Sequence, residues 1–124
     1  MYQNYTPNKT ALAAQTIHFD YDSSAIKSSD KNKLSAVADY MRANAQCALR
    51  VEGNCDERGT EEYNRSLGER RALSAREELI RLGVESIKIV TVSYGEDQPF
   101  AQGHDESAYK QNRRDDFVVL EPPK

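Results

Sequence analysis

The residues that could carry chemistry gather in a short polar run and in the segment that follows it. Residues 53–60 read Gly-Asn-Cys-Asp-Glu-Arg-Gly-Thr and join an alternating apolar stretch to a long helical pattern. If the run folds back over the end of the sheet, Asp56 could oppose Arg71 and offer one anion and one cation to a zwitterionic amino acid. A purely structural Asp56–Arg71 ion pair explains the same pattern, and spacing alone leaves both interpretations open.

Two more side chains fall beside Arg71 on the predicted helix. At about 100° per residue, Asn64, Leu67 and Arg71 lie within about 60° of one another. They border an inner stripe of small residues and leucines, which favours close packing on a sheet. The stripe consists of Gly68, Ala72, Ala75, Leu79 and Leu82.

The sequence argues against catalysis. An enzyme needs a nucleophile with a base, or paired carboxylates in a cleft. The two histidines, His18 and His104, lie near no nucleophile motif. Asp56 and Glu57 are adjacent, so their side chains point in different directions. The glycines of the run are not followed by the Gly-Lys-Ser/Thr of a phosphate-binding loop. We expect neither enzyme activity nor a cofactor.

Cys47 and Cys55 lie on either side of one predicted strand. A strand of this length holds them further apart than the ~7 Å that a disulfide tolerates, at ~3.3 Å per residue. We therefore expect two free thiols. The two histidines do not obviously supply the further ligands of a metal site, so no metal is expected.

Size and charge restrict the class of protein further. The chain has 124 residues, of which 17 are basic and 20 acidic, for a net charge of −3. This length fits one domain. Because acidic residues outnumber basic ones, the chain should not attract a polyanion, and we do not expect it to bind nucleic acid. The sequence contains neither an apolar run of bilayer length nor a charged-then-apolar leader.

Periodicity predicts alternating strands and helices after residue 15. Apolar residues alternate in the strands and recur every three or four positions in the helices. A helix beginning after Ser29 or Asp30 would bury Leu34, Val37, Ala38 and Met41. Thr60 is the expected N-cap of the long helix, and Gly83 is expected just after its end. The predicted elements are strands at 16–20, 49–52, 87–92 and 117–120, and helices at about 31–41, 61–82 and 105–112.

This order, β-α-β-α-β-(α)-β, predicts an α/β sandwich in which helices cover a mixed parallel and antiparallel sheet of four strands. Residues 16–121 would form that domain. Residues 1–15 are polar, contain Pro7 and have no sustained period, so they are predicted to be a flexible, irregular N-terminal arm.

The motifs of this sequence resemble the peptidoglycan-associated lipoprotein family, a branch of the OmpA-like class. The resemblance is carried by Glu-Gly-Asn-Cys-Asp-Glu-Arg-Gly-Thr at 52–60, Tyr-Asn at 63–64 and Leu-Gly-Glu-Arg-Arg-Ala at 67–72. It continues in Phe-Asp-Tyr-Asp at 19–22, Val-Ser-Tyr-Gly at 92–95, Gly-His-Asp-Glu-Ser-Ala-Tyr at 103–109 and Asn-Arg-Arg at 112–114. About residues 16–121 are covered.

The resemblance implies an OmpA-like domain that binds the diaminopimelate residue of the peptidoglycan stem peptide. By that resemblance, Arg71 takes the side-chain carboxylate and Asp56 the amino group. Four more residues would line the pocket: Asp22, Tyr21, Asn64 and Leu67. The resemblance further implies a protein at the periplasmic face of the outer membrane that tethers this membrane to the cell wall as part of the Tol-Pal system. The family also binds the β-propeller protein of the Tol system, through a surface that overlaps the ligand site. The alternative is therefore a protein-interaction module that acts mainly through binding of the Tol-system partner.

Three features depart from the family pattern. The leader and the lipid-modified cysteine of the family do not occur in this sequence, so a lipid anchor would lie outside it. Ser23-Ser24-Ala25 stands where a charged or aromatic residue is common. Asp115-Asp116 stands where a more apolar strand start is usual.

Overall fold

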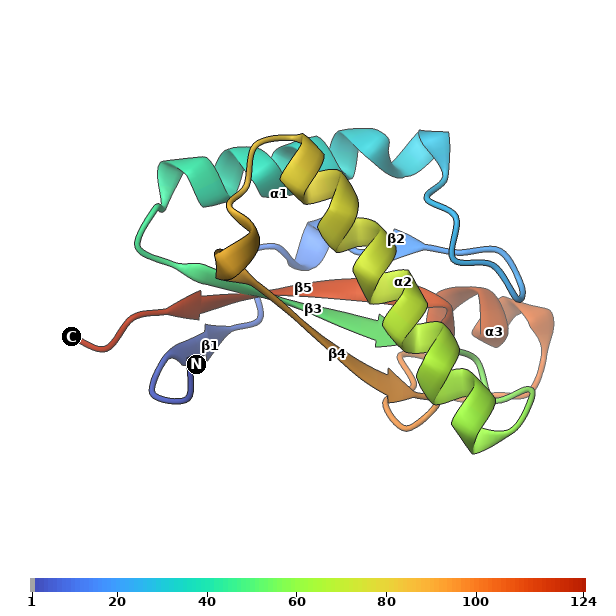
Figure 1. Ribbon diagram of the computed structural model, residues 1–124. Coiled ribbons are helices and arrows are strands. Elements are labelled where there is room, and N and C mark those ends of the chain that lie inside the picture. The colour runs from blue at the N-terminus through green and yellow to red at the C-terminus, as the bar shows by residue number, and fades with distance from the viewer. Residues whose placement is uncertain (1) are drawn as a thin grey trace.

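The computed structural model describes residues 2–124, and within them the strands form one mixed sheet (Figure 1). The sheet has five strands, in the spatial order β1-β5-β3-β4, with β2 also paired to β5. β3 and β4 are parallel, whereas β5 is antiparallel to β1, β2 and β3. Their bounds are β1 Thr6–Asn8, β2 Ile17–His18, β3 Ala48–Asn54, β4 Ile89–Gly95 and β5 Arg114–Glu121. The predicted α/β sandwich with a mixed sheet is confirmed, but the strand number is five rather than four.

Helices lie along one side of this sheet and at one end of it. In Figure 1, α1 and α2 lie on the same face of the sheet, and α3 lies at the end toward which β3 and β4 point. The bounds are α1 Lys31–Ala43, α2 Glu61–Arg81 and α3 Glu106–Asn112. Within residues 2–124, no helix is both long enough and apolar enough to cross a membrane.

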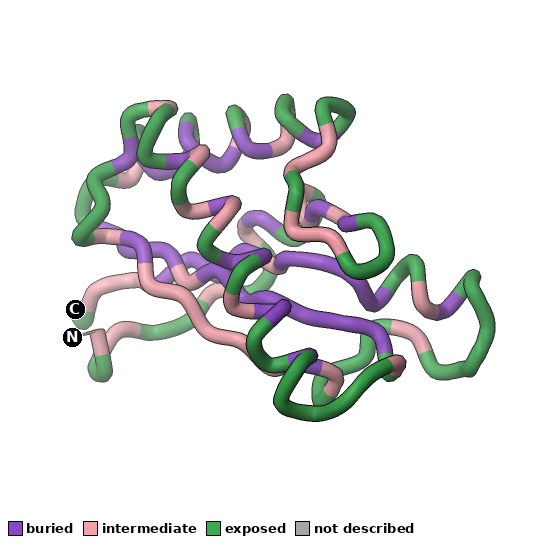
Figure 2. Tube along the Cα trace, turned by 45° about the vertical axis from the view of Figure 1, so that its right-hand side comes forward, coloured by how far each residue is buried: buried purple, intermediate pink, exposed green. Residues whose placement is uncertain are grey.

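The core lies between the two long helices and the sheet. Figure 2 shows buried residues along the strands and recurring along the helices above them. The predicted inner face of α1 is confirmed, since all four of its apolar residues are buried. On α2, Ala72, Ala75 and Leu79 join the same core, while Leu82, just after the helix, is only partly buried against it. Apolar residues that recur every three or four positions in the helices therefore pack against apolar residues that recur every second position in the strands.

Helix ends follow the predicted chemistry with one exception. The Thr60 hydroxyl accepts a hydrogen bond from the Tyr63 amide at 3.1 Å, as an N-cap does. Gly83 has a φ of +104°, which closes the end of α2. Asp30 precedes α1, but its carboxylate accepts from the His18 amide at 3.1 Å instead of capping the helix. That hydrogen bond ties the start of α1 to β2.

The N-terminal segment corrects the prediction of an irregular arm. β1 pairs with β5 from Thr6 opposite Glu121 to Asn8 opposite Val119. Leu12 is only 4% exposed and belongs to the main core. A three-residue strand at the sheet edge needs no alternating apolar pattern and tolerates a proline, so periodicity could not reveal it.

Two predicted strands also shift. Ile87 is 61% exposed and stands in a single 3₁₀ turn, Ser86–Lys88, so β4 begins at Ile89. β5 begins at Arg114, before the apolar run, and its charged first residues pair with β2 and β3. These charged residues concealed the strand start because a half-buried strand is normally recognised by alternating apolar residues.

A contact between two glycines sets the distance between α2 and β3. A Cβ on Gly53 would stand 1.8 Å from the carbonyl oxygen of Gly68, and one on Gly68 would stand 2.3 Å from the Ser93 Oγ. Only residues without a Cβ allow this approach. The polar run that follows β3 is therefore held directly against the first turns of α2.

Replacing Gly53 by alanine should force α2 away from the sheet. We expect Gly53→Ala to lower the free energy of unfolding by about 1–3 kcal/mol, the usual cost of overpacking. Urea unfolding measures the change, and Ser66→Ala, on the exposed side of the same helix, is the control that should change little. Equal stability of the Gly53 variant and the wild type would contradict this account of the packing.

Candidate functional site

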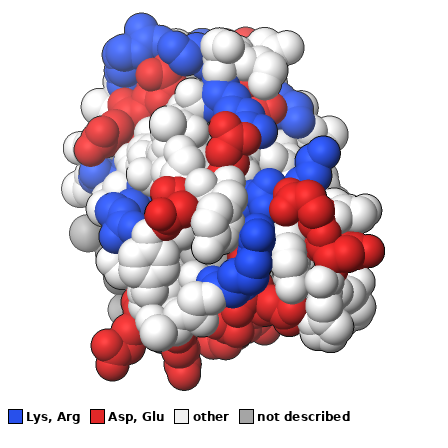
Figure 3. All heavy atoms as spheres, turned by 90° about the vertical axis from the view of Figure 1, so that its right-hand side faces the viewer, with Lys and Arg blue, Asp and Glu red and all other residues white. Residues whose placement is uncertain are grey.

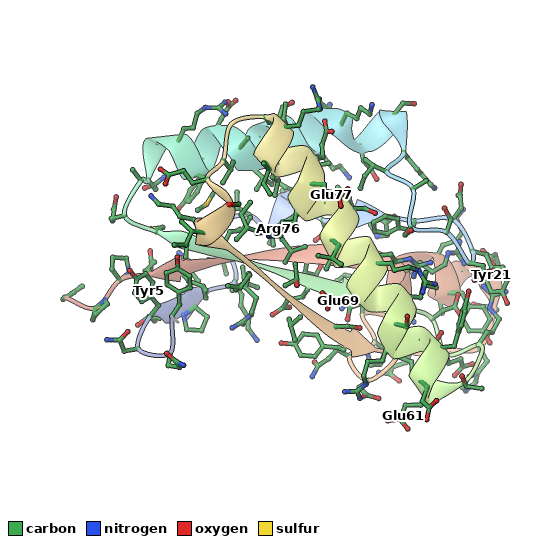
Figure 4. The ribbon with its side chains drawn as sticks, in the orientation of Figure 1. Tyr5, Tyr21, Glu61, Glu69, Arg76 and Glu77 are labelled. Carbon is green, nitrogen blue, oxygen red and sulfur yellow. The ribbon has the colours of Figure 1, made fainter. Side chains whose placement is uncertain are left out.

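A small pocket lies where β3 ends and the first half of α2 passes over the sheet. Its volume is about 40 Å³, and all six residues predicted from the sequence line it. Figure 4 shows Tyr21 at this end of the molecule, on the side of α3, with Glu61 at the nearby start of α2. The lining residues are Tyr21, Asp22, Cys55, Asp56, Arg58, Gly59, Tyr63, Asn64, Leu67 and Arg71. The structure thus brings the six predicted residues together, while their role as ligand contacts stays a prediction.

Arg71 forms the base of the pocket and is only 1% exposed. Its Nε donates to the Ser23 carbonyl at 2.8 Å, Nη1 to Asn54 at 2.9 Å and Nη2 to Asp20 at 3.1 Å. Burial lowers the pKa of Arg71 from its ordinary value, but a guanidinium in a protein remains charged. The side chain is therefore a fixed cation held by backbone dipoles from two separate segments.

Asp56 is 4% exposed, and its ion pairs are with two other arginines. Arg58 bonds both carboxylate oxygens, with Nη2 at 2.8 Å and Nε at 3.1 Å, and its amide donates at 2.9 Å. Arg113 Nη1 lies 3.5 Å from the same carboxylate. Burial alone would raise the pKa of Asp56, but the hydrogen bonds from Arg58 and the charge of Arg113 lower it overall. The alternative of a structural Asp56–Arg71 pair is therefore wrong.

Arg58 stands between two aromatic rings at the pocket mouth. Its guanidinium carbon lies 4.1 Å from the ring centre of Tyr21 and 4.4 Å from that of Tyr109, both within cation–π range. Glu106, at the start of α3, approaches Arg58 at 3.7 Å and Arg113 at 3.2 Å. Asp56, Arg58, Glu106 and Arg113 thus form a ring in which anions and cations alternate.

Asp22 and Tyr63 form the other side of the pocket mouth. Asp22 has a φ of +56°, a left-handed conformation that aspartate tolerates better than most residues. Its carboxylate accepts a hydrogen bond from the Tyr63 hydroxyl, and this bond raises the pKa of Tyr63. The loop after β2 is thereby fastened to the first turn of α2.

Asn64 and Leu67 complete the wall that α2 provides. The side-chain amide of Asn64 donates to the Asp56 carbonyl at 3.3 Å and to Glu96 Oε1 at 3.0 Å, which holds the loop against the helix. Leu67 is 4% exposed and supplies an apolar surface beside Arg71. Both positions agree with the predicted helix face.

The sequence predicts no role in the site for Arg58, Arg113, Tyr63 or Tyr109. Arg58 belongs to the polar run, and its closeness to Asp56 was the available signal. Arg113 directly precedes β5 and is only 6% exposed. The Asn-Arg-Arg motif at 112–114 was noted, but only the fold shows that its first arginine reaches Asp56.

The surroundings of the pocket are mixed in charge. Figure 3 faces this end of the molecule and shows basic and acidic side chains interspersed over it. A larger open groove of about 880 Å³ runs between α2 and β4, lined by none of the six predicted residues. Among residues 2–124, no cluster of three or more His, Cys, Asp or Glu side chains is placed to hold a metal ion.

Comparison with known proteins identifies the class. The OmpA family matches residues 18–113. The chain therefore belongs to the OmpA family, as the motifs predicted.

The relatives narrow this to one branch of the family. The chain is 45% identical over 102 residues to the peptidoglycan-associated lipoprotein of Pseudomonas putida, covering 82% of this chain and 61% of that protein. It is 40% identical to that of Pasteurella multocida over 92% of this chain and 76% of that protein. The crystal structure of the peptidoglycan-associated lipoprotein from Burkholderia pseudomallei superposes with a TM-score of 0.83 at 38% identity, covering 90% of this chain and 96% of that one. The resemblance to the lipoprotein branch is confirmed.

The cysteines give a test of the site's packing. Both are free and buried, as predicted, and the Cys55 thiol, which lines the pocket, donates to the Asn64 carbonyl at 3.2 Å. Burial raises the pKa of Cys55 to about 11 and also raises that of Cys47. Because the thiolate is the reactive form, both should react slowly with an alkylating reagent at pH 8. Intact mass should show two labels only after unfolding in urea, and rapid labelling of the native protein would contradict the packing.

Proposed function

We propose that this domain binds peptidoglycan without catalysis, by gripping the zwitterionic end of diaminopimelate in the stem peptide. The observation that carries the proposal is the presence of one buried cation, Arg71, and one buried anion, Asp56, in the lining of a single pocket. Membership of the family supports it, since the relatives named above are called peptidoglycan-associated.

Arg71 has donors to spare for a carboxylate. A guanidinium carries five N–H bonds, and its three nitrogens each donate once to a backbone carbonyl. Two N–H bonds are left over, one on each terminal nitrogen. A ligand carboxylate at Arg71 would therefore gain charged hydrogen bonds while the carbonyls keep the arginine in place.

Asp56 would take the ammonium by exchanging a partner. Its carboxylate is bound by Arg58, whose side chain is 34% exposed, so the guanidinium can swing toward solvent. A pocket of about 40 Å³ holds little more than a water molecule, and an amino-acid group needs the space that Arg58 and Tyr21 occupy. Arg113 remains beside Asp56 after the exchange and keeps its pKa low.

The cellular role follows from family membership rather than from the pocket. We propose that the domain tethers the outer membrane to the cell wall from the periplasmic side, through a lipid anchor outside this sequence. The β-propeller protein of the Tol system is the proposed protein partner. The chain spans 61% of the Pseudomonas putida relative, so these roles belong to the proposal.

The simplest test is sedimentation with cell walls. The purified domain should pellet with sacculi that contain diaminopimelate and stay in solution without them. Sacculi with lysine in the stem peptide should retain less of it, because lysine lacks the carboxylate that Arg71 would bind. Equal recovery with and without sacculi would refute the proposal.

A second test assigns the two charges. Asp56→Asn and Arg71→Lys should each weaken binding of a diaminopimelate muropeptide at least about tenfold, since charged hydrogen bonds are worth about 1.5–3 kcal/mol. Arg71→Lys should also lose the preference over the lysine analogue, whereas Asp56→Asn should keep it. Calorimetry measures both ligands, with the exposed Arg70→Ala as the matched control.

Stability must be followed in parallel because Arg71 also joins α2 to two backbone segments, one at residues 20–23 and one at Asn54. Arg71→Ala is expected to lower the melting temperature as well as binding, which is why the lysine variant is the sharper probe. Wild-type affinity in a folded Arg71 variant would refute the assignment of the carboxylate partner.

A further inference from the structure

Asp115, the second residue of β5, is a buried carboxylate that the site described above does not use. Its exposed fraction is 0%, and neither carboxylate oxygen has a hydrogen-bond partner within residues 2–124. A charge buried without partners is costly, so such a group normally has a compensating neighbour or is protonated. Burial raises the pKa of Asp115 well above its ordinary value, and the charge of Arg71 opposes that rise.

The sheet register places Asp115 on the face that α2 covers, opposite the glycine contact that precedes Arg71 in that helix. Asp115 alternates with Phe117 and Val119, so its side chain shares their face of β5, the face covered by the helices. Across the sheet its partner is Gly53, the residue on which α2 packs. Arg71 follows that contact by about one helical turn and donates to the carbonyl of the next residue, Asn54.

We infer that Asp115 is a positioning residue that controls how much positive charge Arg71 offers to an anionic ligand. This inference rests on the proposed role of Arg71. An ionised Asp115 compensates the guanidinium and weakens its attraction for a carboxylate in the pocket. A neutral Asp115 leaves the full charge to the ligand. Ligand binding and protonation of Asp115 therefore favour each other.

The charged and titratable neighbours of Asp115 come from several elements. From α2 only the Arg71 cation acts on it, and from β5 the neighbouring Asp116. Asp116 points to the opposite face, where Arg114 Nε donates to it at 3.0 Å. Cys55, after β3, stays neutral because its pKa is about 11, and the β2 partner of Asp115 is the apolar Ile17.

The same linkage has a defined sign for stability. The folded-state pKa of Asp115 lies above its unfolded value of about 3.9, so its contribution to stability is full below about pH 4. That contribution is lost as the pH rises toward the folded-state pKa. The stability of the wild type relative to Asp115→Asn, which cannot ionise, should therefore fall as the pH rises above about 4.

Calorimetry of the diaminopimelate muropeptide at a series of pH values from 5 upward tests the inference. Wild-type affinity should fall at least about fivefold as the pH is raised through the range in which Asp115 ionises, beyond any change in Asp115→Asn, a typical size for coupled sites. Above that range the variant should bind more tightly than the wild type. Titrations in buffers of different ionisation enthalpy should show proton uptake on binding that is absent from the variant.

Controls separate this coupling from the proposed function and from a structural defect. Asp116→Asn, on the outer face, should keep the wild-type fall in affinity. Asp115→Ala provides a second neutral side chain if the asparagine variant folds poorly. Identical pH profiles in the wild type and both Asp115 variants would overturn the coupling alone. Absence of wild-type binding at every pH would overturn the proposed function and the coupling with it.

Discussion

The backbone contact between Gly53 of β3 and Gly68 of α2 is the constraint on which the site depends. Because no side chain lies between the two elements, the helix has a single depth at which it can pack. Asn64, one turn before the contact, then reaches the carbonyl of Asp56, and Arg71, one turn after it, reaches the carbonyl of Asn54. Both ends of the pocket are positioned by the same contact.

The two central charges are stabilised in different ways, and the difference matters for binding. Arg71 is held by carbonyl dipoles, which orient the guanidinium without cancelling its charge. Asp56 is held by two cations, one buried and one at the surface. A carboxylate ligand can therefore add to Arg71, while an ammonium ligand must replace a partner of Asp56. The pocket is preorganised for the anionic half of a zwitterion. The cationic half can bind only by replacing an arginine that is already paired with Asp56.

The helices and the polar run could be predicted because their signals are local. Apolar residues every three or four positions determine the buried face of α1, and Thr60 and Gly83 determine the ends of α2. β1 could not be predicted, since its three residues depend on the edge of β5 rather than on their own pattern. The partner Arg113 was missed for the same reason, because only the antiparallel pairing of β5 brings it to Asp56.

The start of β5 was noted in the sequence for its two adjacent acidic residues, but only the fold shows what each of them faces. Asp115 and Asp116 stand where the resemblance implied a more apolar strand start, and they are adjacent, so the strand turns them to opposite faces. Asp116 meets Arg114 and the Thr16 hydroxyl on the outer face, while Asp115 turns inward toward the charge of Arg71. Two adjacent carboxyl groups thus meet different surroundings, one paired with a cation on the outer face and one buried without a hydrogen-bond partner. The buried carboxyl is tolerated because burial raises its pKa well above the ordinary value and so favours the neutral form, while the charge of Arg71 opposes that rise.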